Sequence, residues 1–484
     1  MEQAAKKNNL VEFLKGSSIL VVSNICLKAM NFLLLPLYTK YLPADSLGIS
    51  DSVTNLTGLI FPLLTLGLDS AFSAFYFEKK DPERGKKVYS TLSVMFLILG
   101  LVAASLSVLA KPLSNLLFHS AAYQGIVVMA FLSLAVNLWY LPFSLELRMK
   151  NRMLAFGIAN ISASLSMILL NILFVSVFQL REQALILSSL LSNGLQLLIL
   201  FLFVRRTPKK EELDKKLLKA MLRFSLPLVP MSLLNWVLAL SDRYVLLHYY
   251  GEGTVGVYGI AMRFVTVLNV LISAVAMAYT TFAFQTKDEE GAKRKYYYVF
   301  QTESLLLLGM CFTISMFGGE IIRLMSSDAA YYEAAEPLRD LLFAQAVYAM
   351  SNVVGYGINF AKKSGYYLLS VSVGVALNLG LNLLLIPAYG MKAAALTTLL
   401  GYLAVFLLVY CFSERLYPCS YGVLRAAGLA VVLYALCFFL EDVSVWIRLG
   451  VWAVAAAGAL FLFRDTVKQL GSFFRDKVFH RGRT

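Results

Sequence analysis

Residues 41–51 read YLPADSLGISD, and residues 249–259, about 208 positions further along, read YYGEGTVGVYG, with Gly48 aligned with Gly256. The charged segments that follow also match, since FEKKDPERGKK at 77–87 is similar to FQTKDEEGAKRK at 284–295. Chance similarity between leucine-rich segments is the alternative explanation, but apolar composition does not force polar loops to agree. The pattern therefore predicts an internal duplication.

The composition of the whole chain is that of a membrane protein. Of its 484 residues, 59% are hydrophobic and 15% are charged, and the mean hydropathy is +0.70. Soluble domains contain about 45–50% apolar and about 25% charged residues. One membrane-spanning helix needs about 20 mostly apolar residues, so the chain has room for about fourteen. We expect an all-α polytopic membrane protein, and soluble classes are excluded.

Polar breaks divide the chain into fourteen apolar segments of suitable length. Spans are expected near residues 16–38, 50–75, 88–110, 123–145, 154–177, 184–204, 222–247, 254–285, 297–324, 336–360, 366–387, 392–412, 424–440 and 447–463. Because the repeat offset contains six spans, both copies enter the membrane in the same direction, which is a parallel repeat. Two six-helix lobes around a central cavity are the layout of transporters that work by alternating access.

This layout predicts four parts in the chain. They are an N-lobe of helices 1–6 (residues 1–204), a basic cytosolic linker (205–221), a C-lobe of helices 7–12 (222–412), and helices 13–14 with a basic cytosolic tail (413–484).

The formal net charge is +14, from 43 Lys and Arg against 29 Asp and Glu. Most of the cations fall in the tails and in alternate loops, which is the positive-inside pattern and predicts that both termini are cytosolic. No basic face, zinc-ligand spacing or nucleotide-binding glycine loop accompanies them, so we expect no nucleic-acid partner. The five cysteines show no disulfide or metal spacing. The N-terminal residues lack a cleavage pattern, so no removed signal peptide is expected.

The first predicted span contains a lysine at mid-depth, Lys28, about twelve residues from either end. Such a lysine costs about 2.5–3.5 kcal/mol on insertion scales unless water or a partner receives it. Its side chain is too short to reach the membrane surface from there. Asn24 and Asn31 share its helical face, at four residues before and three after. We therefore expect Lys28, Asn24 and Asn31 to line the central cavity.

Other polar residues lie within spans 2, 7, 8 and 9. In span 2, Asp51, Asn55 and Asp69 are spaced to share one helical face. As further cavity residues we expect Asn55 and Arg263, and as residues that couple Na⁺ or H⁺ we expect Asp51, Asp69 and Asp242. Arg243 is expected to be structural, and Glu303 a helix-end charge.

These residues suit a transported anion rather than a reaction. Fixed cations in a wet cleft suit a phosphate or pyrophosphate, and Asn, Ser, Thr and Tyr side chains hydrogen-bond sugar hydroxyls. The sequence shows no His/Asp/Ser arrangement and no cluster of acidic metal ligands. We therefore expect no enzyme, resident metal or cofactor.

Two long segments resemble a known family. FLLLPLYTKYLPADSLGISDSVTNLTGLIFPLLTLGLDSAFSAFYFE (32–78) resembles the opening of Wzx-type polysaccharide flippases, and SDRYVLLHYYGEGTVGVYGIAMRF (241–264) resembles the matching segment of their second half. These flippases belong to the multidrug/oligosaccharidyl-lipid/polysaccharide exporter superfamily, which also contains the lipid II flippases. The resemblance implies two six-helix lobes, often with two added helices.

The resemblance also implies a function and roles for two residues. Members move undecaprenyl-pyrophosphate-linked oligosaccharides from the inner to the outer leaflet of the bacterial cytoplasmic membrane. The related lipid II flippases have cations in helices 1, 2 and 8 of a central cavity, and Lys28 and Arg263 match the first and last of these. Helix 2 has no Arg or Lys here, which favours the polysaccharide branch over lipid II.

We therefore expect a flippase for cell-surface polysaccharide biosynthesis, driven by an ion gradient or the membrane potential. Its expected partners are the lipid-linked oligosaccharide, membrane lipids and the polysaccharide polymerase machinery. The first alternative is a multidrug cation antiporter of the same superfamily, although such proteins usually have twelve helices and acidic drug sites. The second is a membrane enzyme, such as a polysaccharide polymerase or a glycosyltransferase, although no large external loop, cytosolic domain or acidic motif is present.

Overall fold

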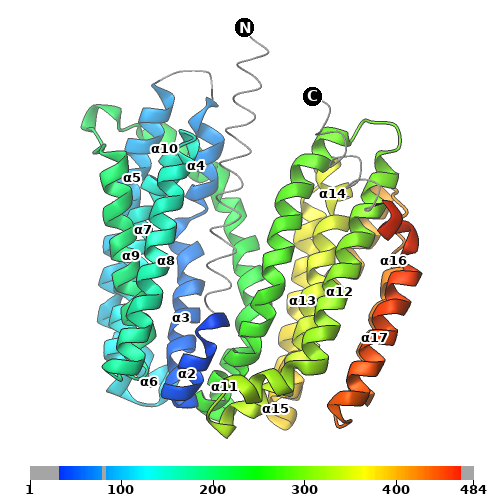
Figure 1. Cartoon of the computed structure of the whole chain (residues 1–484). Helices are drawn as coiled ribbons and strands as arrows, with labels where there is room; N and C mark the ends of the chain where they lie inside the picture. The colour runs from blue at the N-terminus through cyan, green and yellow to red at the C-terminus, as the bar shows by residue number, and fades with distance from the viewer. Residues whose placement is uncertain (1–31, 79–82, 470–484) are drawn as a thin grey trace, which may run out of the picture. The chain divides into compact units, whose positions relative to one another are not determined.

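The computed structural model describes residues 32–78 and 83–469, and within them every regular element is a helix (Figure 1). In this part of the chain, ten helical segments are long and apolar enough to cross a membrane, and Val423–Phe439 is a shorter apolar helix. The predicted fold class, an all-α polytopic membrane protein, is confirmed. The count of fourteen spans stays a prediction, because most of the first span lies outside the described residues.

The helices follow the predicted spans closely. In the first half of the chain they are α2 (Leu35–Tyr41), α3 (Ala44–Thr65), α4 (Leu68–Tyr76), α5 (Arg84–Ser105), α6 (Ala110–Phe118), α7 (Gln124–Met149), α8 (Met153–Ile172), α9 (Gln183–Val204) and α10 (Lys215–Ser225). In the second half they are α11 (Val229–Thr286), α12 (Ala292–Met325), α13 (Leu338–Val354), α14 (Tyr356–Phe360), α15 (Gly365–Leu416), α16 (Val423–Phe439) and α17 (Val445–Leu462).

Two of these helices are too long for one crossing. At 1.5 Å per residue, the 58 residues of α11 would extend about 87 Å, against a hydrocarbon core of about 30 Å. Each long helix contains one glycine with non-helical backbone, Gly251 in α11 and Gly390 in α15. Their positive φ angles of 81° and 57° are available to glycine without a Cβ clash. Each long helix therefore contains two successive spans, as the sequence predicts.

One predicted helix is broken instead. Span 2 was expected to be continuous, but α3 ends at Thr65 and α4 begins at Leu68. Leu66 and Gly67 between them both have left-handed backbone, with φ of 52° and 67°. The helical register is lost across this break, so the expectation that Asp51 and Asp69 share one helical face is wrong.

The described helices form two compact units, residues 1–259 and 260–484. In the first unit α7 packs against α5 and α9, and α8 packs against α9. In the second, α13 packs against α12 and α15, while α16 and α17 both contact α12. The predicted lobe boundaries stay a prediction.

Burial within the units agrees with the predicted duplication. Asn171 of α8 and Asn382 of α15, which are 211 positions apart and so fall near each other in the repeat, are both fully buried. Ser188 and Thr397, aligned at almost the same offset, are fully buried as well. A polar side chain is costly to bury in an apolar bundle, so a shared pattern of buried polar residues is stronger support than shared leucines.

Candidate functional site

The two glycines that the repeat aligns lie against each other. A methyl group on Gly48 of α3 would lie 1.8 Å from the Glu252 carbonyl oxygen and 2.9 Å from the Gly256 nitrogen. A methyl group on Gly256 would lie 2.0 Å from the Ala44 carbonyl oxygen. Small residues allow membrane helices to approach backbone to backbone in this way.

Hydroxyl groups attach the same end of α3 to the segment that precedes α9. The Ser46 hydroxyl donates to the Glu182 carboxylate at 3.0 Å, and the Ser50 hydroxyl donates to the Glu182 carbonyl oxygen at 2.6 Å. Ser46 and Ser50 are buried. These bonds hold the face of α3 that is opposite Gly48.

One and a half turns further along α3, Asn55 contacts an intramembrane cation. Arg243 of α11 donates from Nη1 to the Asn55 amide oxygen at 3.1 Å. Trp236 donates to the Asn55 carbonyl oxygen at 3.2 Å, and Tyr244 donates to the Ser52 carbonyl oxygen at 3.1 Å. Three side chains of α11 are thus bound to two successive turns of α3.

The cluster formed by Asn55, Trp236, Arg243 and Tyr244 still has hydrogen-bond donors without a partner in the described part of the chain. Among the described residues, the buried Arg243 Nε and Asn55 Nδ2 atoms have no hydrogen-bond partner. Both are donors, and the guanidinium carries a positive charge. An anionic oxygen is the group that such donors bind most strongly.

Asp242, the residue before Arg243, points elsewhere. It is 4% exposed, and its carboxylate accepts the Tyr258 hydroxyl at 2.5 Å and the Arg243 backbone N–H at 2.9 Å. Tyr258 is fully buried. Adjacent helical residues diverge by about 100°, so Asp242 and Arg243 serve different neighbours.

The predicted site residues are distributed as follows. Asp51 lies one turn before Asn55 on the same face of α3 and is half-buried, so the structure brings Asp51, Asn55 and Asp242 into one unit. Asp69 lies in the first turn of α4, beyond the break. Arg263, half-buried in the later part of α11, belongs to the second unit. Lys28, Asn24 and Asn31 lie outside the described residues.

Two other charged residues within predicted spans, Arg243 and Glu303, were expected to have no part in the site. Arg243 was expected to be structural, and this stays a prediction: it donates to Asn55, and its buried Nε has no partner among the described residues. Glu303 was expected to be a helix-end charge, and this is wrong, because α12 begins at Ala292 and Glu303 is 2% exposed in its interior.

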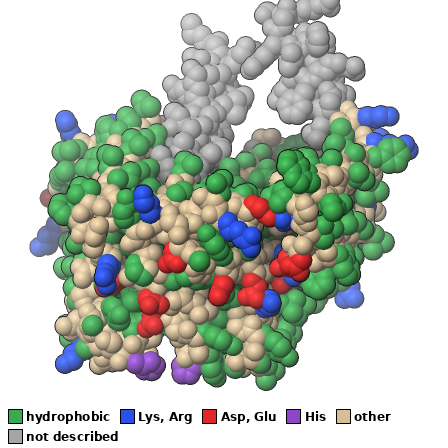
Figure 2. All heavy atoms as spheres, turned by 60° about the horizontal axis from the view of Figure 1, so that its bottom comes forward, with side chains coloured by type: hydrophobic (Ala, Val, Ile, Leu, Met, Phe, Trp, Pro, Cys, Tyr) green, Lys and Arg blue, Asp and Glu red, His purple; other side chains and the backbone are tan. Residues whose placement is uncertain are grey.

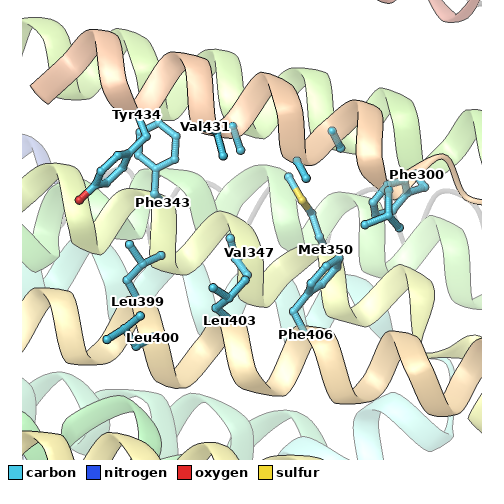
Figure 3. A pocket seen from close by; sticks show the side chains of 14 residues that line it. Phe300, Phe343, Val347, Met350, Leu399, Leu400, Leu403, Phe406, Val431 and Tyr434 are labelled. Carbon is cyan, nitrogen blue, oxygen red and sulfur yellow. The ribbon is translucent and has the colours of Figure 1, made fainter. Parts of the chain in front are cut away.

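The second unit contains polar pairs and an apolar groove. Gln345 donates to Asn269 at 2.8 Å, and Asn382 donates to Asn378 at 3.1 Å. An apolar groove of about 270 Å³ lies between α12, α13, α15 and α16 (Figure 3). Its lining includes Phe343 and Met350 on one side and Val431 on the other.

No metal-binding cluster is found in residues 32–78 and 83–469, where no three His, Cys, Asp or Glu side chains are grouped suitably. The four cysteines in this part of the chain are free. Coupling to Na⁺ or H⁺ stays a prediction.

Comparison with known proteins gives the family. A family model described as "Polysaccharide biosynthesis protein" matches residues 13–282, more than half of the chain. The chain belongs to the polysaccharide biosynthesis protein family. A second model, MatE, matches residues 227–384. The predicted resemblance is therefore confirmed, and this polysaccharide biosynthesis protein is a member of the multidrug/oligosaccharidyl-lipid/polysaccharide exporter superfamily.

Solved structures agree on the fold of this polysaccharide biosynthesis protein. The lipid II flippase MurJ in an inward closed conformation is similar with a TM-score of 0.71 and 14% identity, over 92% of this chain and 99% of that one. An inward-facing multidrug resistance MATE transporter of the MOP superfamily is similar with a TM-score of 0.64 and 15% identity, over 83% and 95%. The family and these structures are of flippases and transporters, not of catalytic enzymes.

A curated relative also spans most of the chain. The uncharacterized membrane protein MJ1068 of Methanocaldococcus jannaschii is 20% identical over 429 residues, 83% of this chain and 84% of the relative. With the apolar helices, these matches establish a multi-pass membrane protein of a transporter family.

Proposed function

We propose that the protein moves a polyprenyl-pyrophosphate-linked oligosaccharide from the inner to the outer leaflet of a bacterial cytoplasmic membrane by alternating access. The observation that carries this proposal is the intramembrane Arg243 guanidinium, held by Asn55 and still presenting a buried donor. An arginine within a span is costly unless it pairs or faces a wet cavity, so such residues mark substrate pathways.

The rest of the proposed site is consistent with this substrate. Lys28 and Arg263 would add cations to the same pathway, and pyrophosphate is the anion that several fixed cations suit. Apolar surface for a polyprenyl tail is available in the larger of two grooves along α16, which measures about 900 Å³ and lies between α16 and α17. Arg425 and Arg464 stand at the end of the larger groove.

Net transport in one direction requires an energy source and a defined orientation of the protein in the membrane. We propose that both termini are cytosolic and that Na⁺ or H⁺ binding, or the membrane potential, drives the cycle. Asp51 and Asp242 are the candidate ion-binding residues in the first unit. A polysaccharide polymerase would use the flipped product on the outer side.

A multidrug cation antiporter is the second candidate, favoured by the MatE match over residues 227–384. The substrate of an antiporter would be a cation, whereas the proposed flippase substrate is an anion, so one assay with both substrates distinguishes the two candidates. Purified protein in liposomes receives either a fluorescent undecaprenyl-pyrophosphate oligosaccharide or a cationic dye, with and without a pH or sodium gradient. We expect translocation of the lipid-linked sugar alone.

Arg243→Gln is the variant that connects this assay to the site. It should lower flipping roughly ten- to hundredfold, since a hydrogen bond to a charged group contributes about 1.5–3 kcal/mol. Arg415→Gln, at an exposed arginine, is the matched control and should leave the rate unchanged. Movement of the dye but not of the lipid would favour the antiporter.

A further inference from the structure

A polar pocket of about 500 Å³ lies in the second unit, where α12 ends, α13 begins and α16 turns into α17. Side chains of both signs line it: Arg323, Arg339, Arg448, Glu320, Glu336, Glu441 and Asp442. Figure 2 shows Lys or Arg side chains beside Asp or Glu side chains on the end of the helices that is lowest in Figure 1. A lining of mixed charge does not favour a simple anion or a simple cation.

Most of these charges are already neutralised. Arg448 of α17 pairs with Glu320 of α12, and its Nη1 also donates to the Met316 carbonyl oxygen at 2.6 Å. Arg339 pairs with Asp340 at 3.1 Å and lies 3.4 Å from Glu441.

Two charged side chains that line the pocket are not neutralised in the described part of the chain. Glu336 is bound by Lys392 at 2.6 Å, but Arg323 and Asp442 take part in no ion pair within the described ranges. Both side chains are exposed. The pocket therefore offers one unneutralised cation and one unneutralised anion.

The pocket also contains a buried donor that nothing satisfies. Arg448 is 9% exposed, and its Nε has no hydrogen-bond partner among residues 32–78 and 83–469. A guanidinium N–H donates well to phosphate oxygens. This atom indicates where a phosphate of a bound molecule would lie.

The helical faces that border the pocket continue into the apolar groove of Figure 3. On α13, Arg339 borders the pocket and Phe343 and Val347 line the groove, at successive intervals of four residues. On α16, Cys437 borders the pocket and Tyr434, three residues earlier, lines the groove. Residues three and four apart share a helical face, so a polar pocket and an apolar groove form one continuous surface.

The length of the groove matches one lipid leaflet. Along α16 it extends from Val423 to Tyr434, about 17 Å at 1.5 Å per residue. Half of the hydrocarbon core of a bilayer is about 15 Å. Where the pocket meets the groove, the Arg339 guanidinium lies 5.0 Å from the Tyr434 and Phe438 ring centres, so a positive charge marks the end of the groove nearest the pocket.

We propose that this surface binds one zwitterionic phospholipid of the ethanolamine type. Its phosphate accepts hydrogen bonds from Arg448 and Arg323, its ammonium donates to Asp442, and an acyl chain fills the groove along α16. A lipid with a phosphate but no ammonium leaves Asp442 unneutralised and places its charge near four carboxylates. The bound lipid connects the α16–α17 pair to α12 and α13, a role separate from that of the transported substrate.

Native mass spectrometry of the purified protein tests this proposal. Phosphatidylethanolamine and phosphatidylglycerol of equal chain length are added at equal concentration. We expect the wild type to retain one phosphatidylethanolamine preferentially. Asp442→Asn should lower the ratio of ethanolamine to glycerol lipid about fivefold, and Arg323→Gln should weaken binding of both lipids.

A second carboxylate variant serves as the control for Asp442→Asn. Glu333→Gln removes an exposed carboxylate near the pocket that does not line it, and it should leave the ratio unchanged. An unchanged ratio in Asp442→Asn, or equal retention of the two lipids by the wild type, would overturn the proposal. Displacement of the retained lipid by an equimolar polyprenyl pyrophosphate would also overturn it, because the groove would then belong to the substrate. None of these readouts requires flipping.

Discussion

The contact between Gly48 and Gly256 can be tested by adding one methyl group. In Gly48→Ala the new carbon would lie 1.8 Å from the Glu252 carbonyl oxygen. Carbon–oxygen contacts between helices normally measure about 3.3–3.6 Å, so α3 and α11 would have to separate by roughly 1.5 Å. Overpacking of this kind costs about 1–3 kcal/mol, which lowers the population of the closely packed state about 5- to 150-fold.

Disulfide cross-linking measures that population. The Cβ position at Gly253 lies 2.5 Å from an Asp45 carboxylate oxygen, so Asp45→Cys and Gly253→Cys place two thiols near each other in a background without the native cysteines. Adding Gly48→Ala should lower the cross-linking rate by the factor above. Gly58→Ala on the same helix is the control, because its new methyl group would meet only Trp236, at 3.4 Å. An unchanged rate in Gly48→Ala would refute the close approach of the two helices.

Three further predictions concern other contacts. Arg243→Lys keeps the charge but loses the planar guanidinium, so it should recover only part of the flipping rate that is lost in Arg243→Gln, measured in the same liposomes. Tyr258→Phe removes the hydroxyl that Asp242 accepts and should lower stability by about 1–3 kcal/mol in thermal unfolding, whereas Tyr249→Phe at an exposed site should not. Burial would raise the pKa of Glu212, but hydrogen bonds from Ser90 and Arg206 outweigh it and hold the pKa below 4.5. A lowered pKa stabilises the fold above pH 4.5, and the stabilisation is lost as the pH falls further, so the melting temperature of Glu212→Gln should depend less on pH in that range than that of the wild type.

The helices were predictable because hydropathy is a property of local sequence. Within the described residues, the apolar segments between polar breaks form helices, and the glycines at 251 and 390 mark the turns between spans that the sequence had separated. The break at Leu66 and Gly67 was missed, because one glycine among apolar residues does not reveal that its neighbour also adopts left-handed backbone.

The candidate site was predictable only in part. Asn55 was identified from its spacing to Asp51, and Asp242 from its charge within a span. The contact of Asn55 with Arg243 joins residues 188 positions apart, and it depends on how α3 and α11 pack. The aligned glycines were visible in the sequence as a repeat, but only the structure shows that they touch.

The most direct test of the account compares two substrates of the reconstituted protein. One is the polyprenyl-pyrophosphate oligosaccharide, and the other is an uncharged lipid with the same sugar. If the intramembrane arginine recognises the pyrophosphate, the wild type flips the charged substrate much faster, and Arg243→Gln reduces that rate toward the rate for the uncharged lipid. Equal rates for the two lipids in the wild type, or an unchanged preference in Arg243→Gln, would contradict the account.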